Sequence, residues 1–193
     1  ESDPRSDLAR DLLMEWLSGE LCSSTDERAR VARISSLVLA GDCVQQAAWK
    51  QVSETKSMES NPFAFLDPYI DQLCETLDAV VVMPGMHDPC TVTLPQQPLL
   101  RTLLPRASQR TSLHLGTNPT WFSLNGRAIL ATSGQNLDDL LKYMPDDAKR
   151  DSSAALDMAV ATLRWSHMAP TAPDTLWCCL LYTSDAADEE DSV

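Results

Sequence analysis

Two short runs of consecutive apolar residues, with a helical pattern between them, constrain the fold of this chain most. Leu37–Ala40 reads LVLA and Ala79–Met83 reads AVVVM, and each run ends at a glycine-containing turn. Strands that are apolar at consecutive positions are typical of central strands covered on both faces of a sheet. Between the two runs, Phe65–Leu77 carries apolar residues at helical spacing. The order strand, helix, strand predicts an α/β sheet.

Other segments also have clear patterns. The opening Ser6–Leu21 has leucines and a tryptophan at helical spacing before Ser-Gly, which predicts a helix and its end. Thr120–Gly134 predicts a hairpin, because Asn125-Gly126 supplies two residues that adopt positive φ between apolar strands. Two more helices are predicted over Leu137–Tyr143 and Ser153–Trp165. The second of these has one face that we expect to pack, which consists of Leu156, Val160 and Leu163.

Composition limits the class of protein. The formal net charge of −13 disfavours a nucleic-acid-binding surface, which needs clustered Lys and Arg, although a local basic patch remains compatible with it. No apolar run approaches the roughly 18 residues of a membrane helix, so no membrane partner is expected. The six cysteines form no CxxC pair and no spaced metal quartet, which predicts reduced thiols in an intracellular protein.

Several candidate metal ligands follow predicted strands. Asp42 ends the first strand in LAGD, His87 and Asp88 follow the second in PGMHD, and His167 comes later. Strand exits of this kind resemble the metal-binding loops of dinuclear metallophosphoesterases, where carboxylates, an asparagine and histidines surround two cations. Met86 stands where the asparagine belongs, and a thioether is a poor ligand for a hard divalent cation.

A second departure from that pattern lies near Asp42, because Gln45 replaces the second aspartate of the motif. The ligands that remain are too few for two cations, so the site is predicted to be degenerate and to hold no cofactor. Each candidate also has a purely structural explanation: Asp42 as a turn or helix cap, His87 as a partner of a neighbouring carbonyl, and His167 as an ambiguous loop residue. Two alternatives stay open, an active dinuclear metallophosphoesterase and a residual single-metal site at Asp42 and His87.

Other catalytic chemistry has less support. Ser133 lies beside a glycine in TSGQN, but the sequence has no GxSxG elbow, and no phosphate-binding GxxxxGK[ST] loop occurs. His114 lies in an apolar stretch and is expected to be structural. The five tryptophans are expected in the core and at interfaces, since few basic residues flank them.

The motifs LVLAGD, VVVMPGMHDPCTVTLPQQPL, LGTNP, TSGQN and HMAPTAPDTL, in this order, resemble a known family. It is the B-subunit family of DNA polymerases alpha, delta and epsilon, and the TLPQQPL and APTAPDTL stretches are most similar to the small (B) subunits of polymerase delta. The resemblance implies a calcineurin-like metallophosphoesterase sandwich, with mixed sheets flanked by helices, that has lost its metals and its catalysis. It also implies that residues 1–178 are an incomplete domain, truncated at both ends.

The family resemblance further implies a scaffold function in nuclear DNA replication and repair. The expected partners are the catalytic subunit of DNA polymerase delta, through its C-terminal cysteine-rich metal-binding domain, and a third subunit that connects to the sliding clamp. DNA is expected to be contacted only indirectly, or through a domain that precedes residue 1. Which residues of this chain contact those partners does not follow from the resemblance.

The last fifteen residues differ from the rest of the chain. CLLYTSDAAD, which begins at Cys179, is the in-frame translation of the reverse strand of a common transposase sequencing adapter. We therefore expect residues 179–193 to be translated adapter and disordered. They contain five acidic residues, so no function is assigned to the acidic end of the chain.

Overall fold

The computed structural model describes residues 4–44, 63–145, 151 and 153–179, with the side chains of residues 4–7 excluded. The chain divides into two compact units. Unit 1 consists of Glu1–Leu39, Cys43–Met83 and Leu99–Gly116. Unit 2 consists of Ala40–Asp42, Pro84–Pro98 and Thr117–Val193.

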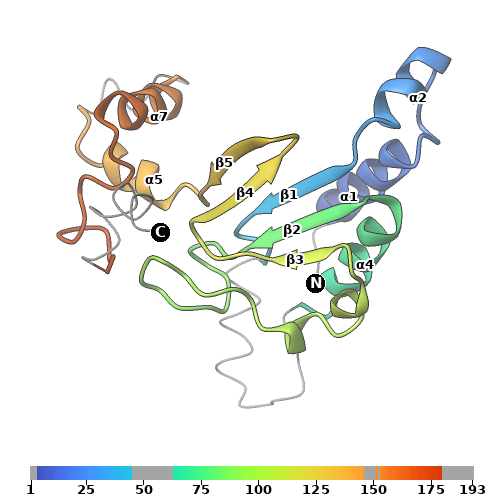
Figure 1. Cartoon of the computed structure of the whole chain (residues 1–193), viewed down its shortest axis with the longest axis horizontal. Coiled ribbons are helices and arrows are strands. Elements are labelled where there is room, and N and C mark those ends of the chain that lie inside the picture. The colour runs from blue at the N-terminus through green and yellow to red at the C-terminus, as the bar shows by residue number, and fades with distance from the viewer. Residues whose placement is uncertain (1–3, 45–62, 146–150, 152, 180–193) are drawn as a thin grey trace. The chain divides into compact units, whose positions relative to one another are not determined.

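Unit 1 contains a three-stranded sheet in the order β1-β2-β3 (Figure 1). Its strands are β1 (Ser36–Ala40), β2 (Ala79–Met83) and β3 (Leu113–Leu115). β2 pairs with β3 in parallel, with Val80 opposite Leu113 and Val82 opposite Leu115. Both valines are fully buried, so β2 is the central strand that its consecutive apolar residues predict.

The prediction for the first strand is only half right. β1 forms where LVLA predicts it, but its residues are half-buried or exposed, and within the described residues it lies at an edge of the sheet. The expectation that this strand is central and covered on both faces is therefore wrong for the described part of the chain. An apolar run cannot distinguish a central strand from a strand at the edge of a sheet.

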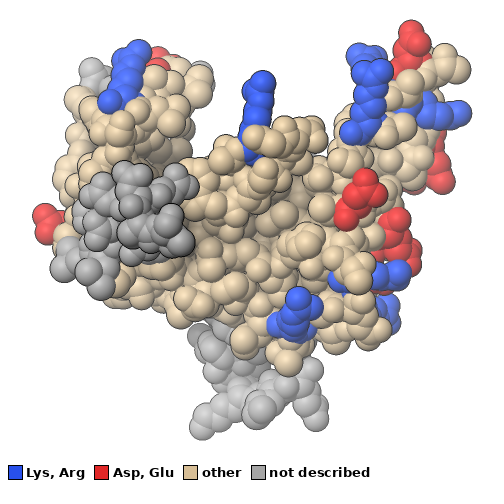
Figure 2. Space-filling view, in the orientation of Figure 1, with Lys and Arg blue, Asp and Glu red and all other residues tan. Residues whose placement is uncertain are grey.

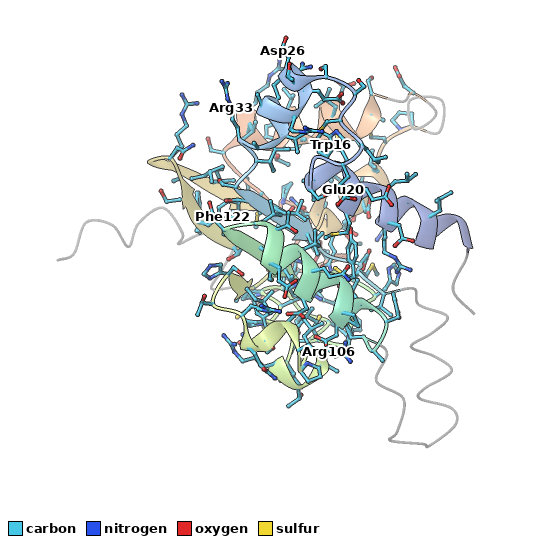
Figure 3. The ribbon with its side chains drawn as sticks, turned by 90° about the vertical axis from the view of Figure 1, so that its right-hand side faces the viewer. Trp16, Glu20, Asp26, Arg33, Arg106 and Phe122 are labelled. Atoms are coloured by element: carbon cyan, nitrogen blue, oxygen red, sulfur yellow. The ribbon has the colours of Figure 1, made fainter. Side chains whose placement is uncertain are left out.

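The described part of unit 1 also contains helices and two short 3-10 turns: α1 (Pro4–Leu17), α2 (Thr25–Val31), α4 (Leu66–Thr76), η1 (Arg101–Leu103) and η2 (Ala107–Gln109). α4 contacts β2, η2 and α1, and in Figure 3 it lies in front of the strands. The predicted apolar face of α4 is confirmed, since Ile70 and Leu73 are fully buried. No helix in the described residues is long and apolar enough to cross a membrane.

Two polar contacts attach the segment before β3 to α4. The buried carboxylate of Asp67 accepts the backbone N–H groups of Arg106 (3.0 Å) and Ala107 (2.9 Å), at the start of η2. Arg110 donates to Asp71 and Glu75, and its guanidinium holds the pKa of the Asp71 carboxyl below the usual value. The second contact is partly solvent-exposed and contributes little to stability, so Asp67 is the stronger attachment.

Unit 2 contains the predicted hairpin. β4 (Thr120–Leu124) and β5 (Arg127–Ala131) pair in antiparallel fashion through a two-residue turn. Asn125 and Gly126 have φ angles of 51° and 75°, as the Asn-Gly pair predicts. The fold is thus mixed α/β, with one sheet containing a parallel pair and one antiparallel hairpin.

Two helices of unit 2, α5 (Gln135–Leu141) and α7 (Ala154–Trp165), contact each other. The sequence predicts both, but the expected packing face of α7 is wrong. Leu156 and Leu163 are 67% and 79% exposed, and Val160 is only half-buried. Helical spacing identifies residues that share a face, and it does not show whether anything covers that face.

Unit 2 also contains a small cluster of buried apolar residues, which consists of Leu94, Ala169 and Leu176. Leu94 pairs with Cys178 in a parallel bridge, and its carbonyl accepts the N–H of Cys179 at 2.8 Å. The APTAPDTL stretch is thereby joined to the LPQQP stretch within the same unit.

Candidate functional site

The LAGD and PGMHD turns of unit 2 meet at two glycines. A Cβ on Gly41, whose φ is 93°, would lie 2.7 Å from the Cα of Gly85. A Cβ on Gly85 would lie 2.2 Å from the backbone nitrogen of Asp42. Only glycine permits this approach at both positions, which explains why both turns contain one.

Asp42 and His87 are the two candidate ligands that the structure brings together. One carboxylate oxygen of Asp42 accepts the backbone N–H of His87 at 2.8 Å. The other oxygen lies 3.3 Å from Nδ1 of the same histidine, and both side chains are partly exposed. Asp42 therefore connects the two turns, and it contacts the backbone as well as the side chain of His87.

Asp88 has a different role. Its carboxylate is buried, and Oδ2 accepts the backbone N–H of Gly85 at 2.9 Å within the same turn. This contact stabilises the reversal of the chain after β2.

His167 follows α7 and is half-buried. Its Nδ1 accepts the backbone N–H of Ala169 at 3.2 Å, so the ring closes its own turn. His114, on β3, is exposed. Met86 is 61% exposed, and Gln45 lies outside the described residues. Within residues that the structure describes, no three His, Cys, Asp or Glu side chains are grouped so that they could hold a metal ion.

Sequence reasoning missed the side chain at the centre of this region, Gln96, which is 1% exposed. Its Nε2 donates to the carbonyls of Gly85 (3.1 Å) and Thr91 (2.8 Å) and to the sulfur of Cys90 (3.1 Å). Its Oε1 accepts from the side chains of Asn118 (2.7 Å) and Gln135 (3.2 Å). Both ends of the amide are thus fully used.

The bonds continue from Asn118 to Ser133. Asn118 Nδ2 donates to Ser133 Oγ at 2.6 Å, and Asn118 Oδ1 accepts the backbone N–H of Ser133 at 3.1 Å. We call Gln96, Asn118, Ser133 and Gln135 the amide cluster. It joins the LPQQP, LGTNP and TSGQN stretches to the PGMHDPC turn, although these are far apart in sequence. Ser133 is a hydrogen-bonding partner in this cluster.

A weak signal for the amide cluster exists in the sequence. Each of the three stretches combines Gln or Asn with nearby Pro or Gly, a combination that also marks ordinary surface turns. Gln96 and Gln97 are adjacent and identical in type, yet one is buried and the other exposed. Pattern reasoning therefore could not select the buried one.

Cys90 lies beside this cluster and is unsuited to nucleophilic chemistry. Burial, followed by the charges of Asp88 and Asp42, raises the pKa of its thiol to about 11. The group therefore stays protonated at neutral pH, whereas nucleophiles and metal ligands need the thiolate. Its sulfur is instead a hydrogen-bond partner of Gln96.

Comparison with known proteins gives one consistent family. Residues 2–187 match the sequence profile of the family described as the B subunit of DNA polymerases alpha and epsilon. The DNA polymerase delta small subunit of Arabidopsis thaliana is 36% identical over 172 residues, which cover 86% of this chain. The DNA polymerase delta small subunit of Saccharomyces cerevisiae is 31% identical over 195 residues, covering 89% of the chain. DNA polymerase delta subunit 2 of Drosophila melanogaster is 34% identical over 185 residues, covering 92%.

The matches cover a smaller share of the relatives. The chain spans 37% of the Arabidopsis protein, 39% of the yeast protein and 40% of the Drosophila protein. The similarity therefore concerns a part of each relative.

Proposed function

Because this chain belongs to the B-subunit family of DNA polymerases alpha and epsilon, we propose that it is part of a non-catalytic accessory subunit of DNA polymerase delta, active in nuclear DNA replication. The observation that carries the proposal is the similarity to three polymerase delta subunits over 86–92% of the chain. The proposed role is that of a scaffold. It would bridge the catalytic subunit, at its C-terminal metal-binding domain, and a third subunit that connects to the sliding clamp.

We also propose that the fold is calcineurin-like and catalytically degenerate. The contacts of the candidate ligands support this proposal. Asp42 accepts a backbone N–H, Asp88 closes its own turn, and His167 accepts an N–H from its own turn. Each side chain thus has a structural task that requires no metal.

Co-purification tests the proposed function. The full-length protein is co-expressed with the catalytic subunit of DNA polymerase delta from the same organism, and one of them carries an affinity tag. We expect an equimolar complex that survives size-exclusion chromatography, because a stable interface buries enough area to resist dilution. A matched control uses the catalytic subunit of polymerase epsilon instead, which is expected to be recovered in much smaller amount. Recovery of the full-length protein alone, or equal recovery of both polymerases, would contradict the assignment to polymerase delta.

A further inference from the structure

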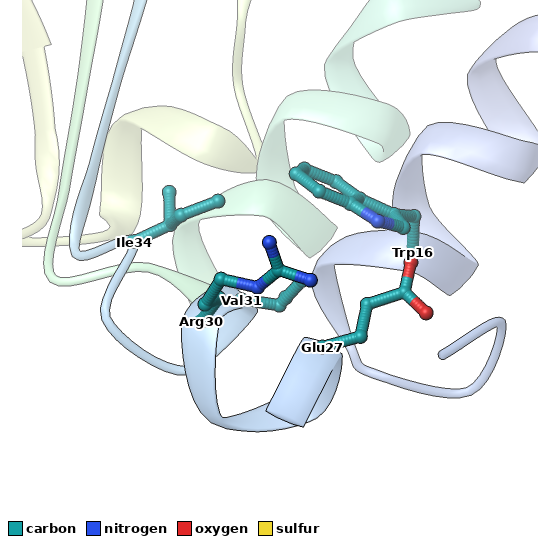
Figure 4. A pocket seen from close by; sticks show the side chains of 5 residues that line it. All are labelled: Trp16, Glu27, Arg30, Val31 and Ile34. Atoms are coloured by element: carbon teal, nitrogen blue, oxygen red, sulfur yellow. The ribbon is translucent and has the colours of Figure 1, made fainter. Parts of the chain in front are cut away.

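We draw no further inference here: the strongest candidate, the pocket of about 260 Å³ that Trp16, Glu27, Arg30, Val31 and Ile34 line in unit 1 (Figure 4), carries none, because acidic and basic side chains lie together over the adjoining helix α2 (Figure 2) and nothing in the part of the chain that the structure describes shows what would occupy it.

Discussion

Gln96→Ala is expected to lower the free energy of unfolding by about 3 to 5 kcal/mol, because it removes a buried amide that has hydrogen bonds at both ends. The side chain is 1% exposed, so water cannot replace the lost partners. The carbonyl of Gly85, a buried residue, would lose its 3.1 Å donor, and the buried Asn118 amide would lose its 2.7 Å acceptor. Each buried group left without a partner costs about 1 to 3 kcal/mol, and the cavity adds to that.

The chain provides a matched control for this substitution. Gln97 has the same side chain and is adjacent in sequence, but it is exposed. Gln97→Ala should therefore change the free energy of unfolding by no more than about 0.5 kcal/mol. Denaturant unfolding of the full-length proteins measures both effects, and hydrogen exchange should show lost protection in residues 84–98 of Gln96→Ala. Equal stability of the two variants would mean that the amide cluster does not hold these stretches together.

Asp139→Ala is expected to destabilise the protein by about 2 to 4 kcal/mol, since hydrogen bonds to a charged group are stronger than those between neutral groups. The carboxylate of Asp139, on α5, is 1% exposed. It accepts from Lys142 Nζ at 2.7 Å and from Thr175 Oγ1 at 2.6 Å. Thr175 belongs to the APTAPDTL stretch, so this carboxylate joins that stretch to α5.

The ionisation of Asp139 should also make the stability of the protein depend on pH. Burial raises the pKa of Asp139, but the hydrogen bonds and the charge of Lys142 outweigh it, so the folded-state pKa lies below the usual 3.8. The unfolded chain has a pKa of about 3.9, hence the contribution of Asp139 is present above that pH. It is lost as the pH falls through the lower folded-state value.

Denaturant unfolding between pH 7 and pH 2 checks this dependence. The difference in unfolding free energy between the wild type and Asp139→Ala should be largest at neutral pH and should shrink in acid. Asp138→Ala is the matched control, because Asp138 is an exposed neighbour on the same helix. A difference between wild type and Asp139→Ala that does not change with pH would show that the ionised carboxylate is not the stabilising group.

The sequence predicts the elements of this fold better than their environments. Val80 and Val82 belong to an apolar run, and both are buried in the central strand. Asn125-Gly126 makes the turn that its φ preferences require. In contrast, Leu156 and Leu163 have the spacing of a packed helix face and are exposed. Local pattern determines which residues share a face, whereas burial depends on what else contacts it.

The candidate site, like the fold, could be predicted only in part from the sequence. Asp42 and His87 follow neighbouring strands, and turns that follow neighbouring strands meet at one edge of a sheet. In the structure the Asp42 carboxylate lies 3.3 Å from Nδ1 of His87, and whether the pair is the remnant of a metal site stays a prediction. The contacts of Asp88 and His167 within their own turns could not be inferred, since a short side chain can bond locally or reach outward. Gln96 was missed because a polar amide between two prolines has the composition of a surface turn.

The most direct test of the central claim, that this is a scaffold and not a catalyst, compares the wild type with the double variant Asp42→Asn, His87→Gln. The Oδ1 atom of the new asparagine can still accept the backbone N–H of residue 87, so the turns should stay connected. Hydrolysis of bis(p-nitrophenyl) phosphate by the purified full-length protein is measured in Mn²⁺, and primer extension is measured in the reconstituted polymerase complex. We predict no Mn²⁺-dependent hydrolysis by either form, and primer extension that agrees within about twofold. Mn²⁺-dependent hydrolysis by the wild type that disappears in the double variant would contradict the claim.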